Sequence, residues 1–268
     1  MKSQQLHPVR SYTIRQWIVL FFGIGCYILV NGMLFYFIGF VANFGVPKSI
    51  DSGASTNLSL SIVINLSLLL LFGLQHSIMA RQPFKKRIEK WIPPFLERSF
   101  FVLITVLVLA LLVWQWQPLP ELVWSVQSFW LRIVVYLIFV AGWTTMLIAT
   151  YLIDHYELFG VRQVLLHLQG YRMLPHTFKT PFLYQHVRHP MMLGFLVGFW
   201  ATPDMTLSHL IFSIGMSLYI LVGIIYEEKD LLREFGRDYL RYQCLVPRLI
   251  PSIKTFSQKQ HLLKKKNR

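Results

Sequence analysis

The chain has 268 residues, of which 54% are hydrophobic and only 14% are charged, and its formal net charge is +14. Soluble globular domains carry about 25% charged residues, so this composition excludes an ordinary soluble protein. The two cysteines, Cys26 and Cys244, lie far apart and form no CxxC pair, which excludes a disulfide framework and a cysteine zinc site.

Apolar runs follow one another along the chain. Four are expected to cross a membrane, at 17–41, 58–80, 99–116 and 129–153, because each approaches the length of about 20 residues that a spanning helix needs. Two more apolar runs, at 191–201 and 207–226, are separated by Pro203 and Asp204, and the first of them is too short to cross straight through. We therefore predict an all-α fold, a polytopic membrane bundle of about five to six transmembrane helices with a cytoplasmic C-terminal helix.

The basic residues predict the orientation of this bundle. All of the 26 Lys and Arg residues except Lys48 and Arg132 fall in segments that alternate onto one side. The positive-inside rule assigns that side to the cytoplasm, so both termini are expected there. The charge is interpreted as a topology signal, with the lysines at 264–266 resting on anionic membrane lipid, and nucleic acid is not an expected partner.

Ionisable residues gather at the end of the fourth run, where the sequence reads Asp154, His155, Glu157, Arg162 and Gln163. Such groups are costly at a membrane edge unless they are paired or functional. One interpretation is a functional site, and the other is a solvated turn in which Glu157 pairs with Arg162.

A second cluster contains His186, Arg188 and His189 and leads into Pro190, which can begin a helix. The N-terminus of that helix would suit a carboxylate. Gly194 and Gly198 have GxxxG spacing, which lets either another helix or a ligand approach closely, and both interpretations stay open. His186 and His189 form a single HxxH motif, whereas His-box metal enzymes use several such motifs, so no metal is expected.

A third cluster follows the last apolar run. Glu227 and Glu228 stand where that run leaves the membrane, and four apolar or aromatic residues after them share one helical face: Leu231, Phe235, Tyr239 and Tyr242. The alternative interpretation is an amphipathic surface helix with a charged cap.

The order of these motifs resembles a known superfamily. RHPxxxG, a hydrophobic hairpin and EExxLxxxFGxxYxxYxxxVP, within 184–251, are similar to the isoprenylcysteine carboxyl methyltransferases, membrane enzymes that use S-adenosylmethionine. Five further segments resemble the nurim family, and within it the bacterial methanethiol S-methyltransferases: LFGLQHSIMA at 71–80, ERS at 97–99, WQW at 114–116, DHYELFGVRQV at 154–164 and FWATPDMT at 199–206. This second resemblance covers nearly the whole chain.

The resemblance implies a bacterial inner-membrane enzyme that methylates a small thiol, most simply methanethiol to dimethyl sulfide, with S-adenosylmethionine bound in a cytoplasmic pocket. It implies six cofactor-binding residues: His186, Arg188, His189, Gly194, Glu227 and Glu228. Met192 stands where the superfamily often has tyrosine. The resemblance also implies that the chain has two parts. The first is a four-span bundle at 1–153, and the second is a methyltransferase core at 154–268 that contains the cytoplasmic loop, two short membrane helices, the amphipathic helix and the basic tail.

The chemistry of methyl transfer suggests the remaining site residues. A thiol reacts as its thiolate, so a base or a positive field is needed. His155 is the expected base, oriented by Asp154, with His186 as the second candidate, and Arg162 would stabilise the thiolate. The expected substrate contacts are Gln163, Trp143 and Phe199. Alternatives are another acceptor, such as hydrogen sulfide or a prenylcysteine carboxylate, or a non-catalytic membrane scaffold.

Overall fold

The structure is a computed structural model that describes residues 13–53, 57–171 and 177–251. The predicted lysine-rich tail at 264–266 lies outside the described residues. Within them, five helices are long and apolar enough to cross a membrane: α1 (Ile14–Ala42), α2 (Leu58–Ala80), α4 (Pro94–Gln115), α5 (Phe129–Ile153) and α9 (Leu207–Phe235). The protein is therefore an all-α polytopic membrane protein, as its composition predicts.

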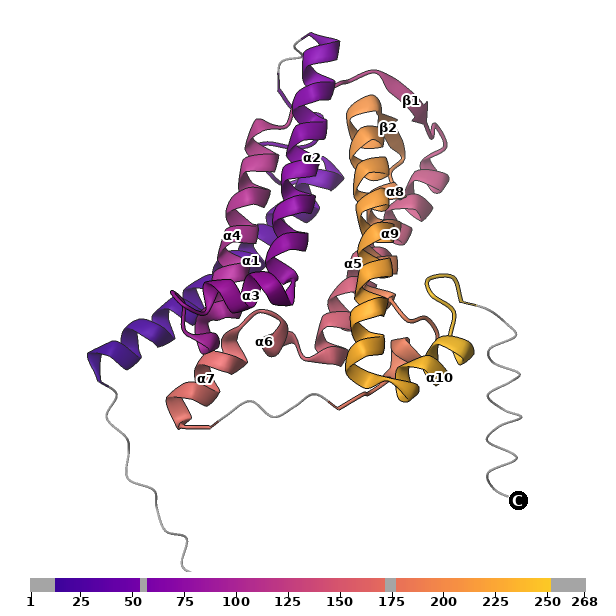
Figure 1. The fold of residues 1–268 in the computed structure, drawn as a ribbon. Helices are drawn as coiled ribbons and strands as arrows, with labels where there is room; N and C mark the ends of the chain where they lie inside the picture. The colour runs from indigo at the N-terminus through magenta and orange to yellow at the C-terminus, as the bar shows by residue number, and fades with distance from the viewer. Residues whose placement is uncertain (1–12, 54–56, 172–176, 252–268) are drawn as a thin grey trace, which may run out of the picture.

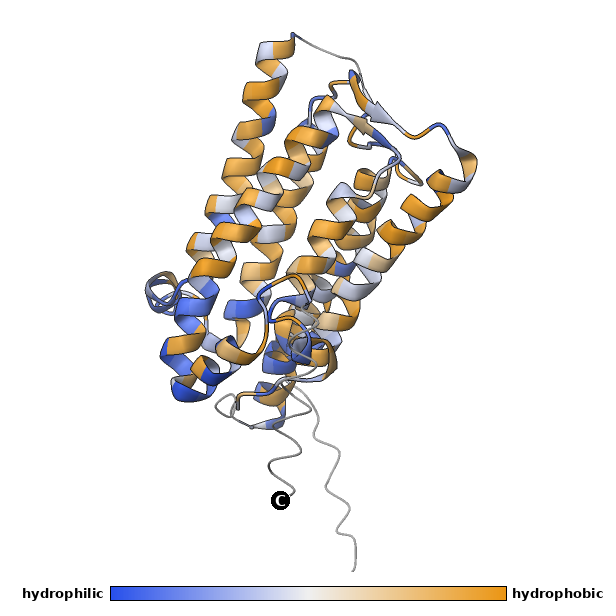
Figure 2. Cartoon of the chain, turned by 90° about the vertical axis from the view of Figure 1, so that its right-hand side faces the viewer, coloured by the Kyte–Doolittle hydropathy of each residue, from blue (hydrophilic) through white to orange (hydrophobic). Residues whose placement is uncertain are grey.

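The helices form two groups that stand side by side (Figure 1). Helices α1 and α2 pack on α4, and α5 packs along the short helix α8 (Pro190–Trp200), which in turn contacts α9. Helix α9 also packs on α2 and joins the two groups. Hydrophobic residues cover the length of the helices, and hydrophilic residues gather at one end (Figure 2).

The remaining elements lie at the two ends of the bundle. Short helices continue the chain at the hydrophilic end: α3 (Gln82–Ile88), α6 (His155–Leu158), α7 (Val161–Gln169), the 3-10 helix η1 (Phe182–Gln185) and α10 (Arg237–Leu245). At the opposite end β1 (Leu122–Ser125) pairs antiparallel with β2 (Asp204–Thr206). The sequence did not predict this small sheet, because it forms in loops between the apolar runs.

One hydrophobic core cluster crosses the whole bundle. Its buried side chains come from α1, α2, α4, α5, α8 and α9, and include Phe40, Phe72, Leu112, Met146 and Phe212. The division of the chain at residue 153 stays a prediction, and this cluster contains residues from both sides of it. Lipid is as apolar as these side chains, so the helices associate mainly through close van der Waals packing.

Helices α5 and α8 approach closely because small residues face each other. A Cβ atom added to Gly194 would lie 2.6 Å from both the Gly142 carbonyl oxygen and the Met146 amide nitrogen. One added to Gly198 would lie 2.8 Å from Nε1 of Trp143. The GxxxG spacing therefore serves helix packing here, and α5 fills the space that a ligand would otherwise need.

The end of the last span differs from its prediction. Helix α9 extends beyond the apolar run to Phe235, and Gly236, at φ 54°, separates it from α10. A positive φ of this kind favours glycine. The break turns the chain, and Leu231 and Phe235 of α9 still pack in one cluster with Tyr239 and Tyr242 of α10, as their shared helical face suggested.

Candidate active site

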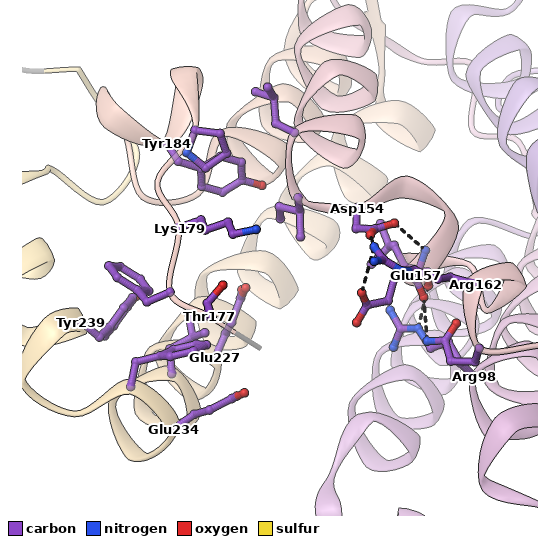
Figure 3. A pocket seen from close by; sticks show the side chains of 18 of the residues that line it. Arg98, Asp154, Glu157, Arg162, Thr177, Lys179, Tyr184, Glu227, Glu234 and Tyr239 are labelled. Atoms are coloured by element: carbon purple, nitrogen blue, oxygen red, sulfur yellow. Dashed lines mark hydrogen bonds and ion pairs between the residues drawn. The ribbon is translucent and has the colours of Figure 1, made fainter. Parts of the chain in front are cut away.

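A cavity of about 1070 Å³ lies at the hydrophilic end of the bundle. Its walls come from the ends of α4, α5 and α9, from α6, α7 and α10, and from the segment around η1. Ligand pockets usually measure about 300–1,000 Å³, so this cavity has room for a nucleoside-sized cofactor and a small second substrate. Figure 3 shows its two walls facing each other.

The first wall carries an ion-pair network. Arg162 forms an ion pair with Asp154, and its guanidinium lies 3.8 Å from the Glu157 carboxylate. Asp154 also caps α6, because its side chain accepts a hydrogen bond of 3.0 Å from the Glu157 amide. Arg98 donates from Nε to the Leu158 carbonyl at 2.6 Å. The predicted pairing of Glu157 with Arg162 is present, and Asp154 is the tighter partner of this arginine.

Gln163 belongs to the same wall. Its Nε2 donates to the Glu157 carbonyl at 3.0 Å, while its Oε1 is enclosed and has no hydrogen-bond partner. Buried polar atoms are normally satisfied, so this oxygen is free to accept a hydrogen bond from a ligand.

The opposite wall is held by four charged or ionisable residues, here named the Glu228 cluster: Arg188, His189, Glu228 and Arg248. Oε1 of Glu228 lies 2.7 Å from Arg188 and 3.1 Å from Nε2 of His189, and its Oε2 accepts from Arg248 at 2.8 Å. Arg188 also donates to the backbone carbonyls of Gln243 and Val246. The cluster therefore joins the start of α8, the end of α9 and the segment after α10.

Beside this cluster, several cavity-lining groups are less constrained. The side chain of Glu227 is 45% exposed, and its carboxylate lies 3.4 Å from Nδ1 of His189. Tyr239 is buried, and its hydroxyl has no hydrogen-bond partner in the part of the chain that the structure describes. Burial raises the pKa of Tyr239 to about 12, so the phenol keeps its proton and can donate it in a hydrogen bond. Figure 3 shows the Lys179 amine pointing toward the first wall, and among the described residues no carboxylate pairs with it.

The structure brings together five of the residues predicted from the sequence. Asp154, Arg162 and Gln163 line the first wall of the cavity, and Arg188 and Glu227 line the second. Three others lie outside the cavity lining. His189 and Glu228 lie within the Glu228 cluster, and Nδ1 of His186 lies 3.1 Å from the Phe182 carbonyl. The first turn of α8 is not among the residues that line the cavity, so the carboxylate site expected at that helix N-terminus stays a prediction.

His155 is placed differently from its prediction. It is buried behind the wall, with Nε2 at 3.0 Å from the Tyr27 hydroxyl and Nδ1 at 2.9 Å from the Thr150 hydroxyl. Its ring stacks on Tyr151, with the ring centroids 4.1 Å apart. Both ring nitrogens have partners, and among the described residues neither bonds to Asp154, so this geometry favours a structural role for His155 over that of the predicted base.

Packing places three further predicted residues away from the cavity. Gly194 contacts α5 and does not line the cavity. Trp143 and Phe199, the expected substrate contacts, are buried in the hydrophobic core cluster, where their rings lie 5.9 Å apart. Aromatic residues in apolar helices commonly pack with one another in this way.

The sequence interpretation missed several cavity residues. Arg98, Lys179, Tyr184 and Tyr239 line the cavity and were not among the predicted site residues. Arg98 belongs to the ERS segment, and Tyr239 belongs to the motif that follows Glu227 and Glu228, so both lie within motifs that carry the family resemblance. Lys179 had no such signal, because an isolated lysine in a polar loop resembles any solvated surface residue.

Known proteins resemble this chain over most of its length. The family model described as NnrU protein matches residues 65–243. "Methanethiol S-methyltransferase 2" of Bradyrhizobium diazoefficiens is 45% identical over 237 residues, which cover 88% of this chain and 90% of that protein. "Methanethiol S-methyltransferase" of Mycobacterium tuberculosis is 41% identical over 238 residues, which cover 89% and 98%.

Nurim is a more distant relative. The Xenopus laevis protein is 34% identical over 175 residues, or 62% of this chain and 61% of its own. No solved structure matches the chain significantly. By its family match and its near full-length identity to these enzymes, the chain belongs to the NnrU protein family, among its methanethiol S-methyltransferases.

Proposed function

We propose that this protein transfers the methyl group of S-adenosylmethionine to methanethiol and so produces dimethyl sulfide. The identity of 41–45% with relatives named methanethiol S-methyltransferase, over nearly the whole chain, carries this proposal. The cavity supports it, because it is lined by residues from the motifs that the chain shares with that family. The methionine in place of a common tyrosine, Met192, does not line the cavity.

The second wall fits the chemical groups of the cofactor. A sulfonium cation is attracted by a carboxylate and by aromatic faces, and Glu227, Tyr184 and Phe178 line this wall together. The Tyr239 hydroxyl is an unsatisfied donor, and the Lys179 amine can hold a carboxylate. We assign Glu227, Tyr239, Tyr184 and Lys179 to cofactor binding, with Arg188 fixing the wall behind them.

When bound, S-adenosylmethionine supplies a methyl group that its positive sulfur has already activated. The protein therefore has to hold the acceptor sulfur in line with the methyl carbon and keep water away. Gln163, with its unsatisfied Oε1, and Arg98 line the first wall of the same cavity. Arg162 is neutralised by Asp154 and Glu157, so its charge acts mainly to fix the first wall.

The position of the cavity suggests where the reaction takes place. It lies at the same end of the bundle as α3, α7 and the start of α8. Arg81, Lys85, Arg162 and Arg188 belong to these segments or border them, whereas Lys48, between α1 and α2, and Arg132, in the first turn of α5, lie at the other end. By the positive-inside rule the cavity then opens to the cytoplasm, where S-adenosylmethionine is made, and a bacterial inner membrane suits its bacterial relatives.

The test is gas chromatography of the headspace above purified protein with S-adenosylmethionine and methanethiol. We expect dimethyl sulfide from the unchanged protein, and at least about a 100-fold lower rate from Glu227→Gln, because a neutral amide attracts a sulfonium far less than a carboxylate does. Glu121→Gln, the same change at the opposite end of the bundle, is the matched control and should keep the full rate.

Binding of S-adenosylmethionine, measured by calorimetry, separates the possible failures. Binding without dimethyl sulfide would show that the acceptor is wrong. Neither binding nor product would contradict the enzyme assignment and favour a scaffold. A Glu227→Gln variant with full activity would contradict the assigned site and leave the reaction standing.

A further inference from the structure

A polar cluster lies apart from the groups assigned above, inside the apolar part of the bundle. Gln75 and His76 on α2 face Thr105 on α4, and we name these three residues the His76 cluster. The His76 ring stacks on Phe72, with centroids 5.6 Å apart, and the edge of Tyr219 on α9 closes it at 6.4 Å. Polar and ionisable residues are costly at such positions and are commonly functional.

The hydrogen bonds favour one tautomer of His76. The Thr105 hydroxyl lies 2.9 Å from the Phe101 carbonyl and 3.4 Å from Nδ1 of His76, and the shorter contact makes the carbonyl its better acceptor. When the hydroxyl donates to that carbonyl, its oxygen is left to accept from Nδ1, which then carries the ring proton. Nε2 then holds a lone pair. Within the described residues it has no hydrogen-bond partner, and it is not fully enclosed.

Gln75 presents a second free acceptor. Its Nε2 donates to the Met79 sulfur at 3.0 Å and reaches the Thr105 hydroxyl at 3.5 Å, whereas its Oε1 is enclosed with no partner. Two acceptors without donors in one apolar setting suit a small ligand that has one weak donor and an otherwise apolar body. An alkyl thiol has this chemistry, because its S–H group is a weak donor.

Phe101 and Arg98 connect the His76 cluster to the cavity. The Phe101 ring lies 4.9 Å from the His76 ring, and the Arg98 guanidinium lies over the Phe101 ring, 5.0 Å from its centroid. Arg98 itself lines the cavity. The ionisable groups that face His76 from the neighbouring helices are Arg98 of α4 and Tyr219 of α9. A thiolate formed here would lie in the field of one nearby cation.

We propose that the His76 cluster binds the acceptor thiol and that Nε2 of His76 removes its proton, an inference that rests on the proposed function. The thiol proton passes to Nε2. The sulfur forms a bond to the donor methyl carbon, while the bond from that carbon to the donor sulfur breaks and leaves its electron pair there. Thiolate and sulfonium charges cancel, and His76 afterwards releases the proton to water. Gln75 Oε1 orients the S–H group before the transfer.

The experiment compares kcat/KM for methanethiol over pH in His76→Gln and in the unchanged protein. A general base contributes about 10²–10⁴-fold, so we expect at least about a 100-fold loss at pH 7. The loss should shrink as the pH rises toward the pKa of the thiol, because solution then supplies thiolate without a base. Affinity for S-adenosylmethionine, measured by calorimetry, should stay within about two-fold, since His76 does not line the cofactor wall.

Two further variants keep the result interpretable. His167→Gln makes the same change on the exposed surface of α7 and should keep the pH profile. Gln75→Met preserves the side-chain shape but removes the free oxygen, so we expect a several-fold higher KM for methanethiol with little change in kcat.

Three outcomes would overturn the proposal while the function stands: a fully active His76→Gln, a loss that is equal at every pH, or a loss that follows weaker cofactor binding. If the unchanged protein makes no dimethyl sulfide, the proposed function itself fails and takes this inference with it.

Discussion

The Glu228 cluster and the His76 cluster are both groups of polar residues in one helical bundle, but their hydrogen bonding differs. In the Glu228 cluster both carboxylate oxygens have positively charged or ionisable partners, from Arg188, His189 and Arg248. In the His76 cluster two acceptors, Gln75 Oε1 and His76 Nε2, have no donor among the described residues.

This difference distinguishes residues that hold the structure together from residues that can bind a ligand. A buried charge whose partners are all provided by the protein holds segments together and has little left to offer a ligand. A buried acceptor without a donor costs stability, and that cost is recovered when a ligand supplies the donor. The three predictions below are changes in folding free energy that test this division, from the largest to the smallest.

Glu228→Gln should be the most destabilising of these changes. It leaves Arg188 buried without its counter-charge, and breaking a buried ion pair typically costs about 3–5 kcal/mol. Chemical denaturation of the protein in detergent micelles measures the loss. Glu227→Gln is the matched neighbour and should change the free energy of unfolding by less than about 0.5 kcal/mol, because its half-exposed carboxylate has one long contact. Equal losses for the two glutamates would remove the distinction between them.

His155→Phe should cost about 1–3 kcal/mol, because the Tyr27 hydroxyl loses its hydrogen-bond partner inside the packed wall. The aromatic contacts with Tyr151 and Phe159 can persist in this variant. The rate of methyl transfer per folded molecule should not change. Measured together, unfolding and activity distinguish this residue from His76, for which we expect the reverse pattern. A slow but stable His155→Phe enzyme would restore the prediction made from the sequence.

The comparison also explains what the sequence could predict. The spans at 58–80 and 129–153 coincide with α2 and α5, because length and hydropathy alone define a spanning helix. Pro190 begins α8 as predicted, since its missing amide hydrogen is not needed at the first helical position. Helix ends that carry charged residues were predicted less accurately. Helix α4 begins at Pro94, about one turn before its predicted apolar run, and α9 continues beyond its own run through charged residues.

The site was predicted only in part, for a physical reason. The high density of ionisable residues at 154–163 led to the prediction of His155 and Asp154 as catalytic residues. The sequence, however, does not show which nitrogens of a histidine ring already have a hydrogen-bond partner. His76 lies in the LFGLQHSIMA segment, but no role was predicted for it, because its neighbours in the sequence are mostly apolar. The contacts that distinguish the two histidines come from Tyr27 and Thr105, which are distant in the sequence from the residues they bond.

The smallest effect is expected at the far end of the bundle. There Arg132 donates to both carboxylate oxygens of Asp204, at 2.8 and 2.6 Å, and Ser125 donates to one of them. The hydrogen bonds from Arg132 hold the pKa of Asp204 below its usual value. The side chains of Arg132 and Asp204 are 32% and 39% exposed, so water and salt screen the pair, and we expect Asp204→Asn to cost only about 0.2–1 kcal/mol at pH 7.

The pH dependence of this cost has a definite sign. The folded-state pKa of Asp204 is lower than its unfolded value, so its contribution is complete above the unfolded pKa of about 3.9 and is lost as the pH falls through the folded pKa. The difference in unfolding free energy between the protein and Asp204→Asn should therefore be constant from pH 5 to 7 and shrink below pH 4. Asp238→Asn, which removes a carboxylate with no ion pair among the described residues, should show neither the cost nor the pH dependence. A difference that grows on acidification would mean that Asp204 is stabilised in its protonated form, which its contacts with Arg132 contradict.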